Sequence, residues 1–188
     1  MNKQEIIVKT VEVLNAGGVI IYPTDTIWGI GCDATNPQAI DKVYRIKHRD
    51  PVKSMLILCS DFEQVRQYVE DYNPSVQAFL ETKKRPTTVV YPQARNLPEN
   101  LLAADGSIGI RVPKSEFCQQ LLTKFGKPIV STSANFSGKK PPANFFELDA
   151  LLVETVDFIV PDEFCDSQFS YSSQVVKIEK NGEIVVLR

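Results

Sequence analysis

Apolar positions along the chain follow two patterns, one with helical spacing and one of short continuous runs. Ile7, Val11 and Leu14 recur at helical spacing before a glycine pair, which is typical of a short amphipathic helix with a C-terminal stop. The segment VIIYP, residues 19–23, is instead a continuous apolar run of strand length. The N-terminal part of the chain therefore predicts a helix followed by a buried strand.

The same alternation continues along the rest of the chain. Helical periodicity behind a capping residue predicts helices at 36–47, 61–72 and 115–126, and a weaker helix at 147–152. Short apolar runs predict strands at 55–60, 87–92, 107–113, 127–131 and 157–161. The last segment, 173–188, predicts a β-hairpin, because two alternating strands flank Asn181-Gly182, a pair suited to a type I′ turn.

This order of elements predicts an α/β protein. Strands separated by helices form parallel neighbours, and a terminal hairpin adds an antiparallel edge. We therefore expect a single domain, residues 1–188, with a twisted, open, mixed β-sheet flanked by helices. A chain of 188 residues is long enough to bury a core of this kind.

Composition and charge narrow the class of protein. Hydrophobic residues make up 43% of the chain and charged residues 23%, as in ordinary globular proteins. The net charge of -2 argues against a general nucleic-acid coat or a membrane-surface protein, which both need a basic excess. The first residues lack the pattern of a secretory signal, and no apolar run approaches the roughly 20 residues that span a bilayer. We expect a cytoplasmic protein without a membrane partner.

Residues that bind metals are sparse, and common nucleotide motifs are missing. The four cysteines lie far apart, so we expect core or near-core thiols rather than a zinc site or a disulfide scaffold. His48 is the only histidine, which excludes sites that need two. The sequence has no GxxxxGK[ST], GxGxxG, GxSxG or HExxH motif. No metal site made by protein side chains is therefore expected.

Three polar clusters follow the apolar runs, at 22–36, 46–53 and 131–138. The first combines small hydroxyls with glycines, which let a ligand approach the backbone closely. In the second, an extended backbone would point Lys47 and Arg49 the same way, so that both grip a polyphosphate. The third carries Ser and Asn side chains, which bind phosphate, carboxylate or the polar edge of a base.

Each cluster also has a purely structural interpretation. The first is typical of a strand-to-helix loop with capping residues, and the second of basic residues that complement a helix dipole. The third satisfies the backbone of a turn equally well. It follows a predicted strand, however, and ligands of open α/β sheets tend to bind beyond the carboxyl ends of strands. Taken singly, the clusters leave both interpretations open.

Taken together, the segments PTDTIWGIGCDA, IKHR, SIGIRVP and PIVSTSANFSG resemble, in order and spacing, the YrdC/TsaC family of threonylcarbamoyl-AMP synthases in its short, single-domain form. The resemblance implies a YrdC-like fold and a nucleotidyltransferase. Such an enzyme joins L-threonine, bicarbonate and ATP, with Mg²⁺, into L-threonylcarbamoyladenylate and releases pyrophosphate. A downstream threonylcarbamoyl-transferase complex then modifies tRNA next to the anticodon.

The resemblance also implies roles for individual residues. The implied catalytic residues are Lys47, Arg49, Ser133 and Asn135. The implied threonine-binding residues are Thr26, Arg111, Ser133 and Ser173. The implied ATP-binding residues are Arg49, Lys53, Ser107, Asn135 and Arg188. Such a reaction depends on positioning and electrostatic stabilisation more than on a protein nucleophile, and an arginine holds the amino acid's carboxylate in bidentate fashion.

Four positions depart from the family pattern. Arg85, in the segment KRPTTVV, stands where glycine is usual, and Trp28 stands where Tyr or Phe is frequent. Leu58 replaces a histidine of longer members, and Ala143 replaces a residue that often carries a hydroxyl. Ligand contacts at Arg85, Leu58 and Ala143 are therefore expected to differ from those of the family.

Two alternatives from other classes stay open. The first is a protein that binds double-stranded RNA or tRNA through a local basic cluster of Lys47, Arg49, Lys53, Lys139 and Lys140. The negative net charge weakens it. The second is a YciO-like paralogue that shares the fold without synthase activity. Its type lacks the Lys-x-Arg and Ser-x-Asn pairs, and both pairs are intact in this sequence.

Overall fold

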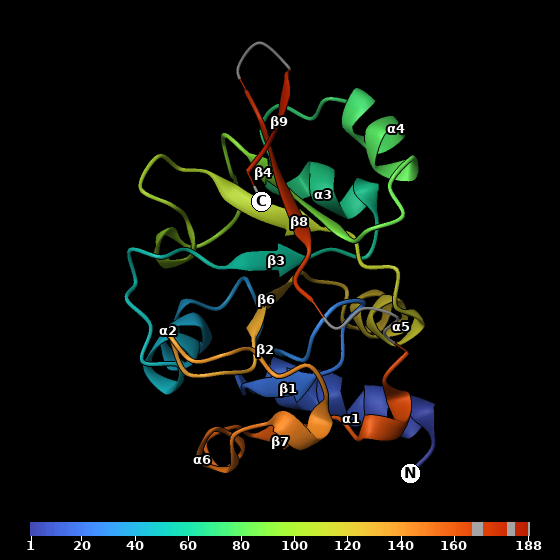
Figure 1. Ribbon diagram of the computed structural model, residues 1–188, viewed down its shortest axis with the longest axis vertical. Helices are drawn as coiled ribbons and strands as arrows, with labels where there is room; N and C mark the ends of the chain where they lie inside the picture. Colours follow the sequence, from blue (N-terminus) through green and yellow to red (C-terminus); the bar gives the residue numbers. More distant parts are fainter. Residues whose placement is uncertain (167–170, 180–182, 188) are drawn as a thin grey trace.

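The computed structural model describes residues 1–166, 171–179 and 183–187. Their strands form one nine-stranded sheet with the order β7-β1-β2-β6-β3-β5-β4-β8-β9 (Figure 1). The strands are β1 (Ile20–Tyr22), β2 (Gly29–Gly31), β3 (Leu56–Leu58), β4 (Thr87–Tyr91), β5 (Ile108–Arg111), β6 (Ile129–Ser133), β7 (Phe158–Ile159), β8 (Gln174–Ile178) and β9 (Ile184–Val186). The helices are α1 (Lys3–Asn15), α2 (Pro37–Ile46), α3 (Phe62–Tyr68), α4 (Ser75–Glu81), α5 (Glu116–Phe125) and α6 (Ala150–Val153), with short 3-10 turns η1 (Glu99–Leu101), η2 (Phe145–Glu147) and η3 (Asp162–Phe164).

The sheet is mixed, which confirms the expected fold class. Strand pairs β1/β7, β3/β5 and β4/β8 are parallel. The pairs β1/β2, β2/β6, β3/β6, β4/β5 and β8/β9 are antiparallel. The predicted hairpin is the β8/β9 pair, and its expected turn at Asn181-Gly182 lies outside the described residues. Antiparallel pairing is thus more extensive than strand and helix alternation alone indicates.

The predicted capping residues begin three helices. The Asn36 side chain accepts from two backbone N–H groups at the start of α2, and Asp61 and Ser115 do the same once each for α3 and α5. Each side-chain oxygen satisfies a donor that the first helical turn leaves without a partner. Gly126 ends α5 in the left-handed conformation, with a φ of 74°. These helices therefore follow from local sequence chemistry.

Three segments differ from the sequence prediction. The segment Gly29–Gly31, expected to belong to a loop, is strand β2, because it pairs with β1 and β6 on its two sides. Helix α4 was not predicted; it follows Pro74, which makes no side-chain cap. The weak helix expected at 147–152 is divided into the turn η2 and the short helix α6.

The core has two parts, one on each face of the sheet. Alternation along β1 sends Ile21 into the larger part, with α2 and α3, and Ile20 and Tyr22 into the smaller part, with α1 and α5. Helices α1 and α5 lie side by side over one end of the sheet (Figure 1). These two helices therefore cover part of one face of the sheet.

Three of the four cysteines, Cys32, Cys59 and Cys118, are buried, which confirms them as core thiols, whereas Cys165 is exposed. Within the described residues, no helix has both the length and the apolar character needed to cross a membrane.

Candidate functional site

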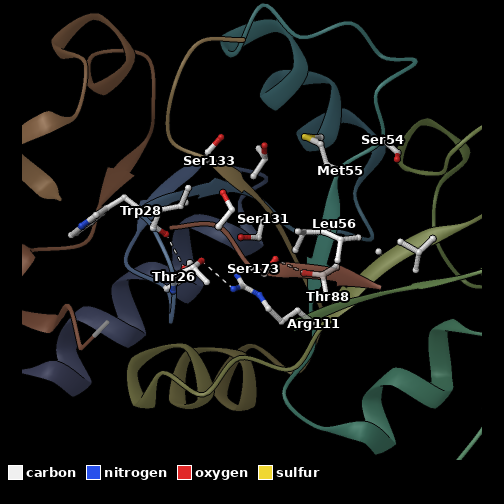
Figure 2. Close-up of a pocket in the computed structure, with 18 of the residues that line it drawn as sticks. Thr26, Trp28, Ser54, Met55, Leu56, Thr88, Arg111, Ser131, Ser133 and Ser173 are labelled. Carbon is white, nitrogen blue, oxygen red and sulfur yellow. Dashed lines mark hydrogen bonds between the residues drawn. The ribbon is translucent and has the colours of Figure 1, made fainter. Parts of the chain in front are cut away.

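A pocket of about 320 Å³ lies on the same face of the sheet as α1 and α5, over the part of that face that these helices leave uncovered. Leu58 and Ile129, which pair across β3 and β6, are buried beneath these helices. The next pair on that face, Leu56 and Ser131, lines the pocket. The pocket also reaches the carboxyl ends of two strands, because Arg111 and Ser133, the last residues of β5 and β6, belong to its lining (Figure 2).

The lining of the pocket is rich in hydroxyl groups and contains two cations. The cations are Arg49 and Arg111. No carboxylate belongs to the part of the lining that the structure describes. The hydroxyl-bearing residues are Thr24, Thr26, Ser54, Thr88, Ser107, Ser131, Thr132, Ser133, Ser172 and Ser173. Two guanidinium groups among neutral hydroxyls make a site for a small anionic ligand.

Arg111 is the last residue of β5, and its guanidinium is held from one side. Its Nη1 donates a hydrogen bond to Thr26 Oγ1 at 3.0 Å, as Figure 2 shows, and lies 2.8 Å from Asp25 Oδ1. Asp25 and Arg111 are both buried. The predicted threonine-binding residues Thr26 and Arg111 are thus in direct contact.

The hydroxyls beside Arg111 form a chain of hydrogen bonds. Thr24 Oγ1 donates to the backbone oxygen of Ile27 at 2.8 Å, and that oxygen can only accept. Thr24 Oγ1 lies 2.9 Å from Thr26 Oγ1, and either hydroxyl can be the donor of that bond. Thr26 Oγ1 in turn accepts from Arg111. The chain therefore links the loop after β1 to the end of β5.

Lys47 lies outside the described lining of the pocket. Helix α2 ends at Ile46, Lys47 keeps a helical backbone, and His48 has a φ of 50°. The backbone is not extended there, so the interpretation that Lys47 and Arg49 point the same way is wrong. The Lys47 Nζ instead donates to the backbone oxygens of Ser133 and Asn135, the latter at 2.6 Å.

Burial also changes the pKa of Lys47. This residue is only 1% exposed. Loss of hydration disfavours its charged form, and the nearby Arg49 adds repulsion. Together they lower the pKa of Lys47 from 10.5 to about 7. The catalytic role predicted for Lys47 stays a prediction, and its contacts are those of a residue that organises a loop.

Ser133 and Asn135 were expected to face one pocket together. Ser133 lines the pocket, but Asn135 is outside its described lining. The Asn135 side chain accepts from Ser133 Oγ and donates to the backbone oxygen of Lys139, each at 2.5 Å. Strand β6 ends at Ser133 and the two side chains are in direct contact, so their shared role toward one ligand stays a prediction. Asn135 fixes the turn that holds Ser133 in place.

Arg49 reaches the pocket from the segment after α2. Its Nε donates to the backbone oxygen of Lys53 and its Nη2 to that of Ser54, both at 2.9 Å. The Lys53 side chain is exposed, and it is not among the described lining residues. Lys53 therefore supports Arg49 through its backbone, and the ATP contact predicted for its side chain remains a prediction.

The remaining predicted residues lie at the far side of the pocket. Ser107 and Ser173 line it, and Ser173 Oγ is 2.8 Å from Thr88 Oγ1 (Figure 2). Arg85 holds the segment before β8: its guanidinium donates to the backbone oxygen of Ser172 at 3.0 Å and lies over the ring of Tyr171. The residue that replaces the usual glycine thus anchors part of the pocket wall. The predicted ATP ligand Arg188 lies outside the described residues.

The other departures from the family pattern lie away from ligand-accessible positions, with one exception. Leu58 is fully buried in the smaller core and is separate from the described lining. Ala143 contacts Glu147 Oε2 through its backbone N–H, and it too is absent from that lining. The exception is Trp28, which lines the pocket and packs its ring edge-on against Phe145.

Sequence reasoning missed Asp25 and Thr88. Asp25 stands between two threonines in a segment otherwise rich in hydroxyls, and a carboxylate there is a signal for a buried basic partner. Thr88 lies in the KRPTT segment, whose departure from the family pattern is the arginine at position 85. Both residues act through contacts with distant parts of the chain, which a local pattern does not specify.

Few side chains of the described residues are placed to coordinate a metal ion. The described residues contain no group of three or more His, Cys, Asp or Glu side chains placed to hold one. Mg²⁺ commonly keeps several waters and binds through substrate phosphates with few protein ligands. The hydroxyl-rich lining fits an ion that enters with a nucleotide, and it does not fit one held by a carboxylate cage.

The fold and the site together define an α/β protein with a mixed sheet and a pocket lined by two arginines and a set of hydroxyls. The profile of the Sua5, YciO and YrdC family, described as "Telomere recombination", matches residues 12–188. The chain belongs to this family. The resemblance of its sequence motifs to the YrdC/TsaC type is therefore confirmed.

Individual relatives agree with this assignment. A protein of Photobacterium profundum named Threonylcarbamoyl-AMP synthase is 34% identical over 158 residues, which are 82% of this chain and 85% of that protein. The structure of P. abyssi Sua5 complexed with L-threonine has a TM-score of 0.88 at 21% identity and covers 100% of this chain and 54% of that one. E. coli YciO has a TM-score of 0.80 at 24% identity, with 100% and 89% covered. The two structures show the shared fold.

Proposed function

We propose that the protein is a threonylcarbamoyl-AMP synthase, which converts L-threonine, bicarbonate and ATP into L-threonylcarbamoyladenylate and pyrophosphate. Relatives that carry this name share about a third of their residues with the chain, and one covers 82% of it. The observation that carries the proposal is the buried Arg111, whose guanidinium is held beside Thr26 at the wall of an anion-binding pocket. It is an enzyme of the nucleotidyltransferase type.

The residues of the pocket suit the chemistry of this reaction. The amine of threonine and bicarbonate form a carbamate with loss of water, and a carbamate oxygen attacks the α-phosphorus of ATP as pyrophosphate leaves. No protein nucleophile is required, so fixed positive charge and hydrogen bonds supply the catalysis. Arg111 is placed to hold the amino acid's carboxylate, and Arg49 to neutralise phosphate charge. Ser107, Ser133 and Ser173 add neutral donors around them.

Mg²⁺ is proposed to enter the pocket with ATP. When bound, it neutralises phosphate charge and stabilises the leaving pyrophosphate. The ATP phosphates and water would hold it for the most part, with the pocket hydroxyls as the available neutral oxygen ligands. The side chains of this chain then have to bind and orient the two organic substrates.

Threonine-dependent release of pyrophosphate tests the proposed function. We expect purified protein with ATP, Mg²⁺ and bicarbonate to release pyrophosphate only when L-threonine is added, with the adenylate detected by mass spectrometry. Arg49→Met should lower this release at least tenfold, as expected for loss of a charge-assisted contact. Arg45→Met is the matched control, because Arg45 is exposed in the last turn of α2. Absence of threonine-dependent release would contradict the proposal.

The product is proposed to pass to a downstream threonylcarbamoyl-transferase complex that modifies tRNA. A cytoplasmic location fits that role and stays a prediction. Direct RNA binding is less well supported, because the expected basic cluster loses a member: Lys47 is buried, whereas Lys139 and Lys140 are exposed. A YciO-like activity would leave pyrophosphate release absent in the same assay, so one experiment separates the alternatives.

A further inference from the structure

Asp25 is a buried carboxylate that sits behind Arg111. Its side chain is 7% exposed and that of Arg111 is 4% exposed. Asp25 Oδ1 lies 2.8 Å from Arg111 Nη1, and Asp25 Oδ2 accepts the backbone N–H of Lys114 at 3.0 Å. Asp25 is not one of the described residues that line the anion pocket. It therefore touches the guanidinium from the side away from the ligand.

We propose that Asp25 is a positioning residue, which sets the Arg111 guanidinium for the carboxylate of the amino acid substrate without contacting that substrate. The inference rests on the proposed synthase function, since it concerns the amino acid subsite of the same pocket. Through Arg111, Asp25 would make the pocket prefer an amino acid with a free carboxylate over one without it, beyond what the shape of the pocket achieves.

The first argument is the rigidity of Asp25 itself. A residue can position another only if its own side chain is fixed. The backbone N–H of Lys114 holds one carboxylate oxygen, and this N–H belongs to the segment directly after β5, the strand that ends at Arg111. Asp25 thus joins the loop after β1 to the end of β5. Both partners of the ion pair are therefore anchored to the sheet.

The second argument is the division of contacts on the guanidinium. Asp25 and Thr26 both engage Nη1, Thr26 by an aligned hydrogen bond and Asp25 by an ion pair. An arginine side chain has several rotatable bonds, and two neighbouring contacts on one nitrogen restrict its orientation strongly. The Arg111 Nε has no hydrogen-bond partner among the described residues. A planar group fixed in this way binds a carboxylate by geometry as well as by charge.

The third argument is the cost of an unpaired buried charge. A buried guanidinium without a counter-ion is strongly unfavourable, so it would turn toward water or distort the empty pocket. Asp25 supplies the counter-charge before any substrate arrives. The pocket is therefore prepared for the carboxylate in its empty state, which lowers the cost of binding.

The test compares the binding of L-threonine and L-threoninamide, which lacks the carboxylate, by calorimetry. In Asp25→Asn we expect the Kd of L-threonine to rise about tenfold or more, whereas the weaker binding of L-threoninamide and the binding of ATP stay unchanged. The matched control is Asp33→Asn. Asp33 is also buried and paired with a cation, Lys127 at 2.8 Å, but lies outside the described lining. It should leave both Kd values unchanged.

Each outcome separates the inference from the proposed function. If the normal protein binds no L-threonine, the proposed function fails. If it binds L-threonine and Asp25→Asn keeps the same preference for the acid over the amide, the inference is overturned. Should Asp25→Asn not fold, Asp25→Glu retains the charge but displaces the carboxylate. It should also lose part of the preference for the acid, and an unchanged preference in this variant equally overturns the inference.

Discussion

The ammonium group of Lys47 closes the turn after β6 by donating to the backbone oxygens of Ser133 and Asn135. These oxygens belong to residues 86 and 88 positions further along the chain. The end of α2 and the end of β6 are thus joined by one buried side chain. Since Ser133 lines the pocket and Lys47 is outside its described lining, Lys47 supports the site from behind.

Replacing Lys47 by Met should therefore abolish most of the synthase activity without removing a ligand contact. The loop at Ser133–Asn135 loses its buried donor, and three oxygen atoms lose a partner. Hydrogen exchange of this loop should become faster while the rest of the sheet stays protected. The control is Lys42→Met, because Lys42 lies on the same helix and also donates to a backbone oxygen, that of Gly17. A fully active Lys47→Met with an unchanged loop would contradict this role.

The stability of the protein should depend on pH through Lys47. Its pKa is lowered from 10.5 to about 7 in the folded chain, so between these values the unfolded chain binds a proton that the folded chain has released. The free energy of unfolding should therefore rise with pH across this window, relative to Lys47→Met. Denaturant unfolding of both proteins from about pH 6 to about pH 11, which spans the two pKa values, measures the difference. A difference that is flat or falls with pH would show that Lys47 keeps its proton when folded.

The hydroxyl chain predicts a difference between two substitutions of Thr24. Thr24→Val removes the hydroxyl that contacts Thr26 and donates to Ile27, and should cost about 1 to 3 kcal/mol of unfolding free energy. Because Thr26 lines the pocket and contacts Arg111, loss of this support should also raise the KM for threonine. Thr24→Ser keeps the hydroxyl and should retain both properties. Equal effects of the two variants would show that packing of the methyl group, not the hydroxyl, matters.

Gly31 is predicted to be irreplaceable for packing reasons. A Cβ atom there would lie 1.8 Å from the backbone oxygen of Val130, so β2 and β6 would have to move apart. Gly31→Ala should lower the free energy of unfolding by about 3 kcal/mol. At Gly29, the nearest atoms to a Cβ are side-chain atoms at 3.3 Å, so Gly29→Ala should be milder and should mainly narrow the pocket. Thermal unfolding of both variants checks the order, and a more stable Gly31→Ala would refute it.

Most of the fold was predictable because its signals are local. The caps of α2, α3 and α5 and the apolar runs of the central strands are readable from neighbouring residues. Helix α4 has a single buried residue, Val76, and no side-chain cap, so it leaves no periodic signal. Strand β2 has the sequence Gly-Ile-Gly, which favours a loop until β1 and β6 supply its partners. Tertiary pairing overrides local preference in that segment.

The site was predictable only in part, for a similar reason. Thr26, Ser107, Arg111, Ser133 and Ser173 meet in one pocket, as the family resemblance implied. The extended backbone expected at Lys47 and Arg49 is absent, because His48 between them is left-handed, and Lys47 instead bonds to the turn after β6. A sequence specifies which residue types are present more readily than which way each one points.

One wall of the pocket comes from a late part of the chain, which is synthesised after most of the other pocket residues. Ser172, Ser173 and Val175 complete the wall, and β8 takes its place in the sheet by pairing with β4, from the middle of the chain. During translation, every strand from β1 to β7 leaves the ribosome before this wall exists. A nascent chain arrested ahead of β8 would already carry Arg49 and Arg111, yet its ligands would face open water on one side. The described pocket wall is thus complete only when β8 has paired with β4.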